Sequence, residues 1–282
     1  MLIKIFQIIH ILLIVLLFVT CTNNDEYIKR GKVKYIHLSH FKMKPTPFIN
    51  PKISNIKLNE YDVVMLGGDL ADSTTKNIES MEYLDSIFDF GNENTLWSVG
   101  NHDFAGDTSL IQTFTKRKHY YAYFKNGIFF LVLDSQKDFS NIVGEQLEFF
   151  NSVMDTIQKT KHLIVLNHKL IWMYNNPTFS TDSINKISNG NFGECVFCLN
   201  PNNFYEDIYP KLQKAKQQGI NVICIGGDIG IKVKEFEHYS KEGIIFLASG
   251  IEDNDSTNKI LVFEHNLDSN LLKWEFKALK DF

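Results

Sequence analysis

Short apolar runs alternate with polar breaks along most of this chain. Four runs rich in Val, Ile and Leu are each followed, within a few residues, by side chains that can bind metal. They are 63–66 before Asp69, 96–99 before Asn101 and His102, 163–166 before His168, and 222–225 before Asp228. Runs of this kind are typical of buried parallel strands, whose carboxyl ends collect ligands. The pattern therefore predicts that four strand ends meet around one cation site.

Periodicity predicts the other elements. Helical spacing of apolar residues predicts helices at 77–88, 144–157 and 205–217. Further apolar or alternating runs predict strands at 32–39, 120–124, 128–133, 243–249, 259–264 and 271–276. The dipeptide Asn126-Gly127 favours a hairpin turn between the second and third of these strands. We expect the last three strands to be mostly antiparallel, because their connections are short.

Segment 172–204 has no clean period. It is rich in Asn and Ser and contains two prolines, and long irregular segments inside a domain are commonly functional. Because it follows the strand that ends at His168, we expect a loop insertion over the site. Cys195 and Cys198 within it predict a local disulfide, whereas Cys224 lies in an apolar run and predicts core packing.

The amino-terminal segment predicts export. Residues 5–19 are almost wholly apolar, and this run is too short for a typical spanning helix. Cys21 follows it and is itself followed by a polar stretch. The segment resembles a bacterial lipoprotein signal at 1–21, in which Cys21 is lipidated, followed by a linker at 22–31 and a single domain at 32–282. An uncleaved anchor is the alternative. Both predict a membrane-tethered protein of the cell envelope, in the outer membrane if the source has two membranes.

Composition limits the classes of partner. The chain has 282 residues, 44% of them hydrophobic, which suffices for one large domain. Its formal net charge is −4, so it lacks the basic footprint of a nucleic-acid-binding protein.

Three motifs in order resemble those of the calcineurin-like metallophosphoesterases. They are Gly68-Asp69-Leu70-Ala71-Asp72, Gly100-Asn101-His102-Asp103 and Asn167-His168. The resemblance implies an α/β fold, a four-layer α/β/β/α sandwich of two mixed sheets flanked by helices. It also implies a site for two divalent metals, commonly Mn, Fe or Zn.

The resemblance assigns a role to each matching position. Asp69 would bridge the two metals, and Asn101 and His168 would bind the second metal. Asp228 stands where the family has a histidine, and a carboxylate there is still a suitable ligand. His102 would protonate the leaving group, with Asp103 orienting its ring.

The departures from the family pattern fall on the first metal. The family opens with D-x-H, where this chain has His40 and Lys42, and Gly230 replaces a final histidine. Lys42 beside Asp69 would act as a cation and hold a phosphate oxygen; a solvated surface lysine is the alternative. His40 is either a surviving ligand or a buried, hydrogen-bonded histidine. We therefore predict one tightly held metal ion rather than two.

These residues predict a metal-dependent hydrolase of phosphate esters that acts on a small phosphorylated substrate. The metal would lower the pKa of bound water, so that hydroxide attacks phosphorus and His102 acts as the general acid. The alternative is a catalytically impaired lipoprotein on the same scaffold that binds a phosphate- or glycan-containing ligand.

Overall fold

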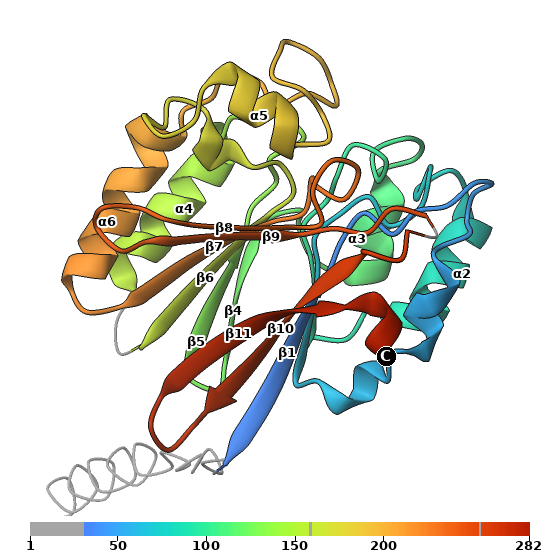
Figure 1. Ribbon diagram of the computed structural model, residues 1–282, viewed down its shortest axis with the longest axis horizontal. Coiled ribbons are helices and arrows are strands. Elements are labelled where there is room, and N and C mark those ends of the chain that lie inside the picture. Colours follow the sequence, from blue (N-terminus) through green and yellow to red (C-terminus); the bar gives the residue numbers. More distant parts are fainter. Residues whose placement is uncertain (1–30, 158–159, 254) are drawn as a thin grey trace, which may run out of the picture. The chain divides into compact units, whose positions relative to one another are not determined.

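Two mixed β-sheets carry the architecture of the computed structural model (Figure 1). The first sheet has the strand order β11-β10-β1-β2-β3. Its strands are β1 (Lys32–Leu38), β2 (Val63–Leu66), β3 (Thr95–Trp97), β10 (Lys259–Asn266) and β11 (Leu271–Ala278). β1, β2 and β3 are parallel, whereas β10 pairs antiparallel with both β1 and β11. The carboxyl ends of β1, β2 and β3 therefore lie at one edge of the sheet.

The second sheet has the strand order β4-β5-β6-β7-β9-β8. Its strands are β4 (Tyr121–Lys125), β5 (Ile128–Val132), β6 (His162–Asn167), β7 (Asn221–Gly226), β8 (Glu235–Tyr239) and β9 (Ile245–Ser249). The four central strands, from β5 to β9, are parallel, and the edge strands β4 and β8 are antiparallel to their neighbours. This arrangement again brings the carboxyl ends of the ligand-bearing strands β6 and β7 to one edge.

Three apolar clusters separate four layers. One cluster lies between the sheets and joins residues such as Met65 of β2 to Ile164 of β6 and Ile225 of β7. The alternate residues of β6, Leu163 and Val165, face the other way, into a cluster with the helices that cover the second sheet. Both faces of these strands are buried, which explains why they appear as continuous apolar runs. The predicted four-layer α/β/β/α fold is confirmed.

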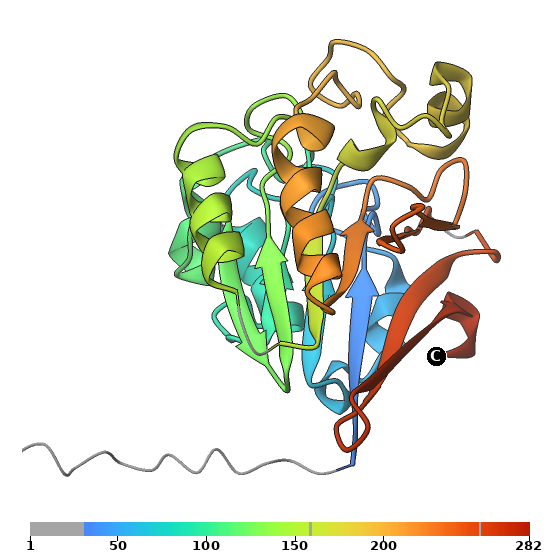
Figure 2. The same ribbon diagram turned by 90° about the vertical axis from the view of Figure 1, so that its left-hand side faces the viewer.

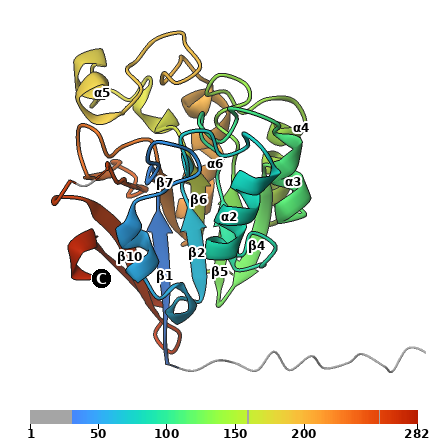
Figure 3. The ribbon, with the colours of Figure 1, turned by 90° about the vertical axis from the view of Figure 1, so that its right-hand side faces the viewer.

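Helices cover the outer face of each sheet. α4 (Gly144–Thr156) and α6 (Tyr209–Gln217) pack on the second sheet (Figure 2). α2 (Ile78–Phe88) and α3 (Ser109–Thr115) pack on the first (Figure 3). A further helix, α5 (Thr181–Ile187), lies above the strand ends in the upper part of Figure 1.

The structure describes residues 31–157, 160–253 and 255–282, and Gly31 to Phe282 form one compact unit. The predicted signal segment 1–21, its Cys21 and the linker up to residue 30 lie outside the described residues. Among the helices of the described residues, none is both long and apolar enough to cross a membrane.

The predicted elements recur with some differences. The 205–217 helix begins with a π-helical turn, Phe204–Ile208, before α6. Segment 172–204 is not wholly a loop, because it contains α5. Of the last three strands, β10 and β11 pair antiparallel. β9 belongs to the other sheet, where it pairs antiparallel with β8 and parallel with β7. The predicted Cys195–Cys198 disulfide is present, and Cys224 is buried and free.

Candidate metal centre

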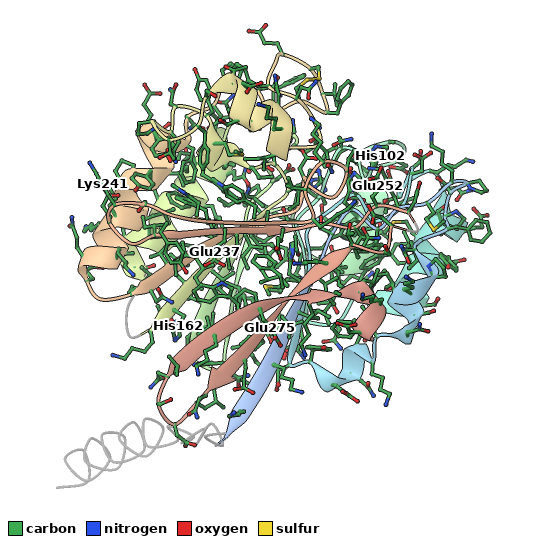
Figure 4. All side chains as sticks on the ribbon, viewed as in Figure 1. His102, His162, Glu237, Lys241, Glu252 and Glu275 are labelled. Carbon is green, nitrogen blue, oxygen red and sulfur yellow. A yellow bond between two sulfur atoms is a disulfide. The ribbon has the colours of Figure 1, made fainter. Side chains whose placement is uncertain are left out.

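The predicted site residues leave the carboxyl ends of five strands. Lys42 and His40 follow β1, Asp69 follows β2, and His168 follows β6. Asn101 and His102 follow β3, and Asp228 follows β7. In Figure 4 the labelled His102 lies at the upper right, away from His162 and Glu275 near the opposite end of the strands. The topology thus brings residues far apart in the chain to one edge of the sandwich.

Backbone packing around Asp69 is tight enough to require glycine. A Cβ on Gly100 would clash with the Asp69 carboxylate, and one on Gly227 would clash with the Gly67 carbonyl. Gly68 and Asp69 both have positive φ angles, 91° and 55°, a conformation that glycine adopts easily and that aspartate tolerates. The small residues that end the apolar runs therefore allow several strand ends to meet around one carboxylate.

His168 is fully buried and prepared to act as a ligand. Its Nδ1 lies 2.7 Å from the Gly67 carbonyl oxygen, to which it donates, so the lone pair is on Nε2. Within the described part of the chain, this Nε2 has no hydrogen-bond partner. It lies 3.6 Å from Oδ1 of Asp69 and 3.9 Å from Oδ1 of Asp228. A buried acceptor without a partner, facing two carboxylates, fits a cation between the three side chains.

The spacing of these donors is close to, but wider than, that of ligands around one ion. Two ligands at about 2.1 Å from one ion lie about 3 to 3.5 Å apart at tetrahedral or octahedral angles. The His168 distances to Asp69 and Asp228 are slightly wider than this. Among the residues that the structure describes, no three His, Cys, Asp or Glu side chains form a ready-made metal cluster. We call His168, Asp228 and Asp69 the His168 side of the site.

Asn101 lies between two backbone contacts of the site. The preceding residue, Gly100, donates its N–H to Asp103, and the following residue, His102, donates its N–H to Asp69 at 2.9 Å. Asn101 itself is partly exposed. Its amide oxygen stays a candidate donor on chemical grounds.

The opposite side of Asp69 is occupied by an ammonium group. Nζ of Lys42 lies 3.0 Å from Oδ2 of Asp69 and 2.6 Å from Nε2 of His40. Nδ1 of His40 donates to the Ile251 carbonyl at 3.0 Å, so His40 Nε2 is the acceptor for Lys42. Both ring nitrogens of His40 therefore have partners, which corresponds to the buried, hydrogen-bonded alternative. We call this pair, again with Asp69, the Lys42 side.

The charges differ between the two sides. Burial alone would raise the pKa of Asp69, but the Lys42 ammonium and the neighbouring histidines hold it below its usual range. Burial raises the pKa of Asp228 to about 6, aided by the Asp69 charge and opposed by His168 and Lys42. Burial, then Lys42, lowers the pKa of His40 to about 3. On the Lys42 side a carboxylate is paired with a cation, whereas on the His168 side burial makes the ionised form of Asp228 less favourable than usual.

The predicted pairing of His102 with Asp103 is wrong. Nδ1 of His102 donates instead to the backbone carbonyl of Asp72 at 2.7 Å, which leaves Nε2 facing the site, 4.0 Å from Oδ2 of Asp69. The Asp103 carboxylate points away because residues 100–103 form a tight turn, with the Asp103 N–H donating to the Gly100 carbonyl. The His102 ring is therefore oriented by the backbone carbonyl of Asp72 and not by Asp103, and the Asp72 carboxylate also lies 3.7 Å from Nδ1.

Asp103 is instead an acceptor that organises the loops. It receives hydrogen bonds from the N–H groups of Asp69, Leu70 and Gly100, the Thr74 hydroxyl and the Trp97 indole. Burial and the Asp69 charge raise its pKa, and several of these hydrogen bonds oppose the rise. Asp103 therefore positions the backbone of Asp69.

Two further contacts were missed by sequence reasoning. The Ser188 hydroxyl donates to Oδ2 of Asp228 at 3.2 Å, and the fully buried Lys169 donates from Nζ to the Val196 carbonyl at 3.0 Å. Burial lowers the pKa of Lys169 to about 8. No periodic signal marks Ser188, and the only hint of Lys169 was its position directly after His168.

Comparisons with known proteins agree with the fold. Residues 45–198 match the family described as calcineurin-like phosphoesterase. This span includes Asp69, Asn101, His102 and His168 and leaves out Lys42 and Asp228. A search of curated proteins found no match.

A search of solved structures finds matches at low sequence identity. A dimetal phosphatase from Danio rerio is 10% identical, with a TM-score of 0.54, over 88% of this chain and 96% of that one. The NAD nucleotidase of Haemophilus influenzae is 13% identical, with a TM-score of 0.43, over 89% of this chain and 51% of that one. The 5′-nucleotidase precursor of Thermus thermophilus is 10% identical, with a TM-score of 0.43, over 88% and 54%.

Proposed function

Because the chain belongs to the calcineurin-like phosphoesterase family, we propose that it hydrolyses phosphate esters with the help of one divalent ion. Asp69, Asn101, His168 and Asp228 would hold this ion. The family implies a divalent metal, and we expect Mn, Fe or Zn for a site with one imidazole and three oxygen donors. The substrate would be a small phosphorylated molecule.

The buried Nε2 of His168 is the observation that carries this proposal. A buried imidazole nitrogen without a hydrogen-bond partner is costly unless something fills its lone pair. The Gly67 carbonyl holds the tautomer that leaves this lone pair free, and two carboxylates face it at 3.6 and 3.9 Å. A bound ion would satisfy all three groups and would supply an activated water and charge stabilisation for phosphoryl transfer.

Lys42 would take the place of a second cation. An ammonium group has three N–H donors, and Lys42 directs two of them at His40 and Asp69. Its side chain is 17% exposed, so the third donor can reach a phosphate oxygen from the site. A fixed positive charge at this position stabilises the charge that develops on the equatorial oxygens.

His102 would deliver the proton to the leaving group. Nδ1 of His102 donates to the Asp72 carbonyl, so in the imidazolium form the ring would carry the proton to be transferred on Nε2, which faces the site. The side chain is 30% exposed, so it can reach a bound ester. General-acid catalysis of this kind contributes about 10²- to 10⁴-fold in rate.

A binding protein on the same scaffold is the rival function. The ammonium of Lys42 fills the position of one cation, and a site with one cation fewer could retain an anion without hydrolysing it. Such a protein would bind a phosphate- or glycan-containing ligand. Catalysis and binding differ in their dependence on His102.

Metal analysis and turnover test the proposal together. We expect the purified protein to bind about one equivalent of Mn²⁺, Fe²⁺ or Zn²⁺ and to hydrolyse 4-nitrophenyl phosphate or bis(4-nitrophenyl) phosphate. His102→Ala should keep the metal and lose about 10²-fold or more in kcat. If wild type and His102→Ala are equally inert with each metal and ester, the binding function replaces the hydrolase.

We also propose that the protein is held in the cell envelope by a lipid on Cys21. The support is the apolar run that precedes Cys21 and the polar stretch that follows it. Mass spectrometry of the membrane fraction should find diacylglycerol on an amino-terminal Cys21. An unmodified Cys21 within an intact chain would indicate the uncleaved anchor instead.

A further inference from the structure

Two loops at the same end of the molecule hold large apolar side chains in water. Phe139 follows β5, and Val196 and Phe197 belong to the disulfide loop of segment 172–204. Their exposed fractions are 55%, 56% and 60%. We call these three residues the apolar rim. Exposed apolar groups gathered in this way mark binding surfaces more often than chance surface positions do.

The loops of the apolar rim are rigidly connected to each other. The Val196 carbonyl accepts hydrogen bonds from Gln136 at 2.8 Å and from Lys169 at 3.0 Å. The Asn200 N–H donates to the Ser140 hydroxyl at 3.1 Å. These bonds join the loop that carries Phe139 to the loop that carries Phe197.

Local backbone features also indicate a built surface. Phe139 and Ser140 have positive φ angles, 49° and 74°, which are unfavourable for residues other than glycine. The Cys195–Cys198 disulfide closes the loop around Val196 and Phe197 (the yellow bond in the upper part of Figure 4). The chain therefore holds strained backbone and a crosslink where it displays apolar side chains.

The same loop is continuous with the metal centre. At its start, the Ser188 hydroxyl and the Asn189 N–H both bind Asp228, the first to the carboxylate and the second to the carbonyl. At its tip, Val196 is held by Lys169, which directly follows His168. The disulfide loop thus runs from a contact with Asp228 to a contact with Lys169, the residue after His168.

We infer that the apolar rim binds the organic group of the substrate, and that this group is an alkyl or aryl moiety. The inference rests on the proposed function, because it takes the phosphate to lie at the metal centre. Lys42 and the ion would hold the phosphate, while Phe139, Val196 and Phe197 would cover the apolar part as it leaves the site. A sugar or a further charged group would leave these side chains in contact with polar atoms and would gain little from them.

A series of alkylphosphonates tests this inference without catalysis. Methyl-, butyl- and octylphosphonate share one anionic head and cannot be hydrolysed, so their affinities report only the contribution of the chain. With Mn²⁺ present, calorimetry should show affinity rising by about twofold per added CH₂, roughly half of the gain from full burial. Phe197→Ser and Phe139→Ser should each weaken the binding of octylphosphonate by at least about fivefold and leave the binding of methylphosphonate unchanged.

Phe124→Ser is the matched control. Phe124 is 48% exposed and lies in β4, next to the hairpin at the other end of the strands. We expect this variant to keep the wild-type dependence on chain length. Thermal unfolding should be unchanged in all three variants, because each replaced side chain is largely in water.

The outcomes separate the inference from the proposed function. If the protein hydrolyses aryl phosphates but binds all three phosphonates equally, the inference is wrong and the hydrolase stands. If affinity rises with chain length in a protein without turnover, the rim binds apolar groups and the hydrolase is wrong. If the wild type dimerises or binds neutral phospholipid vesicles and Phe197→Ser does not, the rim binds that partner, and the inference is overturned.

Discussion

The two sides of Asp69 solve one electrostatic problem in different ways. On the His168 side, a buried imidazole nitrogen that has no hydrogen-bond partner among the described residues faces the carboxylates of Asp69 and Asp228. On the Lys42 side, the corresponding space is filled by an ammonium that contacts both Asp69 and His40. In the proposed function, the first side binds a cation from solution, while the second carries its own in Lys42.

This difference explains why the departures from the family pattern cluster. Asp69 would otherwise have to be buried with an uncompensated charge whenever no metal is bound, which is unfavourable. Lys42 neutralises it permanently, so the fold is stable before the ion arrives. If the proposed function holds, the consequence is a site that binds one ion, with Lys42 supplying the second positive charge.

The largest expected effect comes from the residue that both sides share. Asp69→Asn keeps the shape and the tolerance for a positive φ, but removes the charge that pairs with Lys42. We expect Mn²⁺ affinity to fall more than about 100-fold and the free energy of unfolding of the metal-free protein to fall by about 3 kcal/mol, because Lys42 is left without its counter-charge. Calorimetric titration and urea unfolding measure the two effects.

A second substitution separates charge pairing from other damage. In Asp69→Asn/Lys42→Met, the buried cation is gone as well, so most of the lost stability should return while metal affinity stays low. Equal stability of Asp69→Asn with and without Lys42→Met would contradict the pairing.

The next largest effect is expected when the Lys42 side is given metal ligands like those of the His168 side. His40→Asp/Lys42→His restores the D-x-H pattern of the family and replaces the internal cation with two ligands. We expect the metal content to rise from about one to about two ions per chain, measured by elemental analysis after gel filtration. Lys42→Gln, which removes the cation but adds no strong ligand, is the control and should remain at one. If the double variant also binds only one ion, the missing histidine at position 230, where this chain has glycine, is what prevents binding of the second ion.

Much of this site could be predicted from the order of small and ligand residues after apolar runs. Asp69, His168 and Asp228 meet because parallel strands deliver their carboxyl ends to one edge. The same periodicity gave α2 and α4, and Asn126-Gly127 gave the hairpin of β4 and β5. These features depend on local patterns that survive in a single sequence.

Other features depend on geometry that a pattern does not contain. β8 alternates between exposed and half-buried residues at a sheet edge, so it has no apolar run to reveal it. α3 has seven residues, too few for a clear helical period. Asp103 is adjacent to His102 in the chain, yet the turn at 100–103 sends the two side chains in different directions. Adjacency in the sequence predicted a contact that backbone conformation removed.

The structural role of Asp103 gives a smaller and distinct effect. Asp103→Asn places an amide N–H₂ among five donors that converge on the carboxylate, so at least one hydrogen bond becomes a repulsion. We expect a loss of about 2 kcal/mol in the free energy of unfolding, measured by urea denaturation. Asp107→Asn, at an exposed aspartate of the following loop, is the matched control and should cost little. If Asp103→Asn instead lowers kcat as much as His102→Ala at unchanged stability, Asp103 acts on His102 after all.

The smallest effect uses a histidine far from both sides of the site. His265 of β10 is fully buried at the other end of the strands, where its Nδ1 lies 3.3 Å from the Tyr35 hydroxyl and its ring packs against His162. Burial, then the neighbouring His162, lowers the pKa of His265 to about 4. The unfolded chain therefore binds a proton here below pH 6.5 that the folded chain refuses, so stability is complete above pH 6.5 and falls as the pH drops toward 4.

His265→Gln should remove this part of the pH dependence. Between pH 7.5 and 5.5, we expect the wild type to lose about 1 kcal/mol more stability than the variant, as measured by urea unfolding of the metal-free proteins at each pH. The comparison also calibrates the site, because any acid sensitivity left in His265→Gln must come from groups such as His37 and His40, whose pKa values burial lowers to about 3. Parallel pH profiles in the two proteins would show that His265 is protonated in the folded state and makes no contribution to acid unfolding.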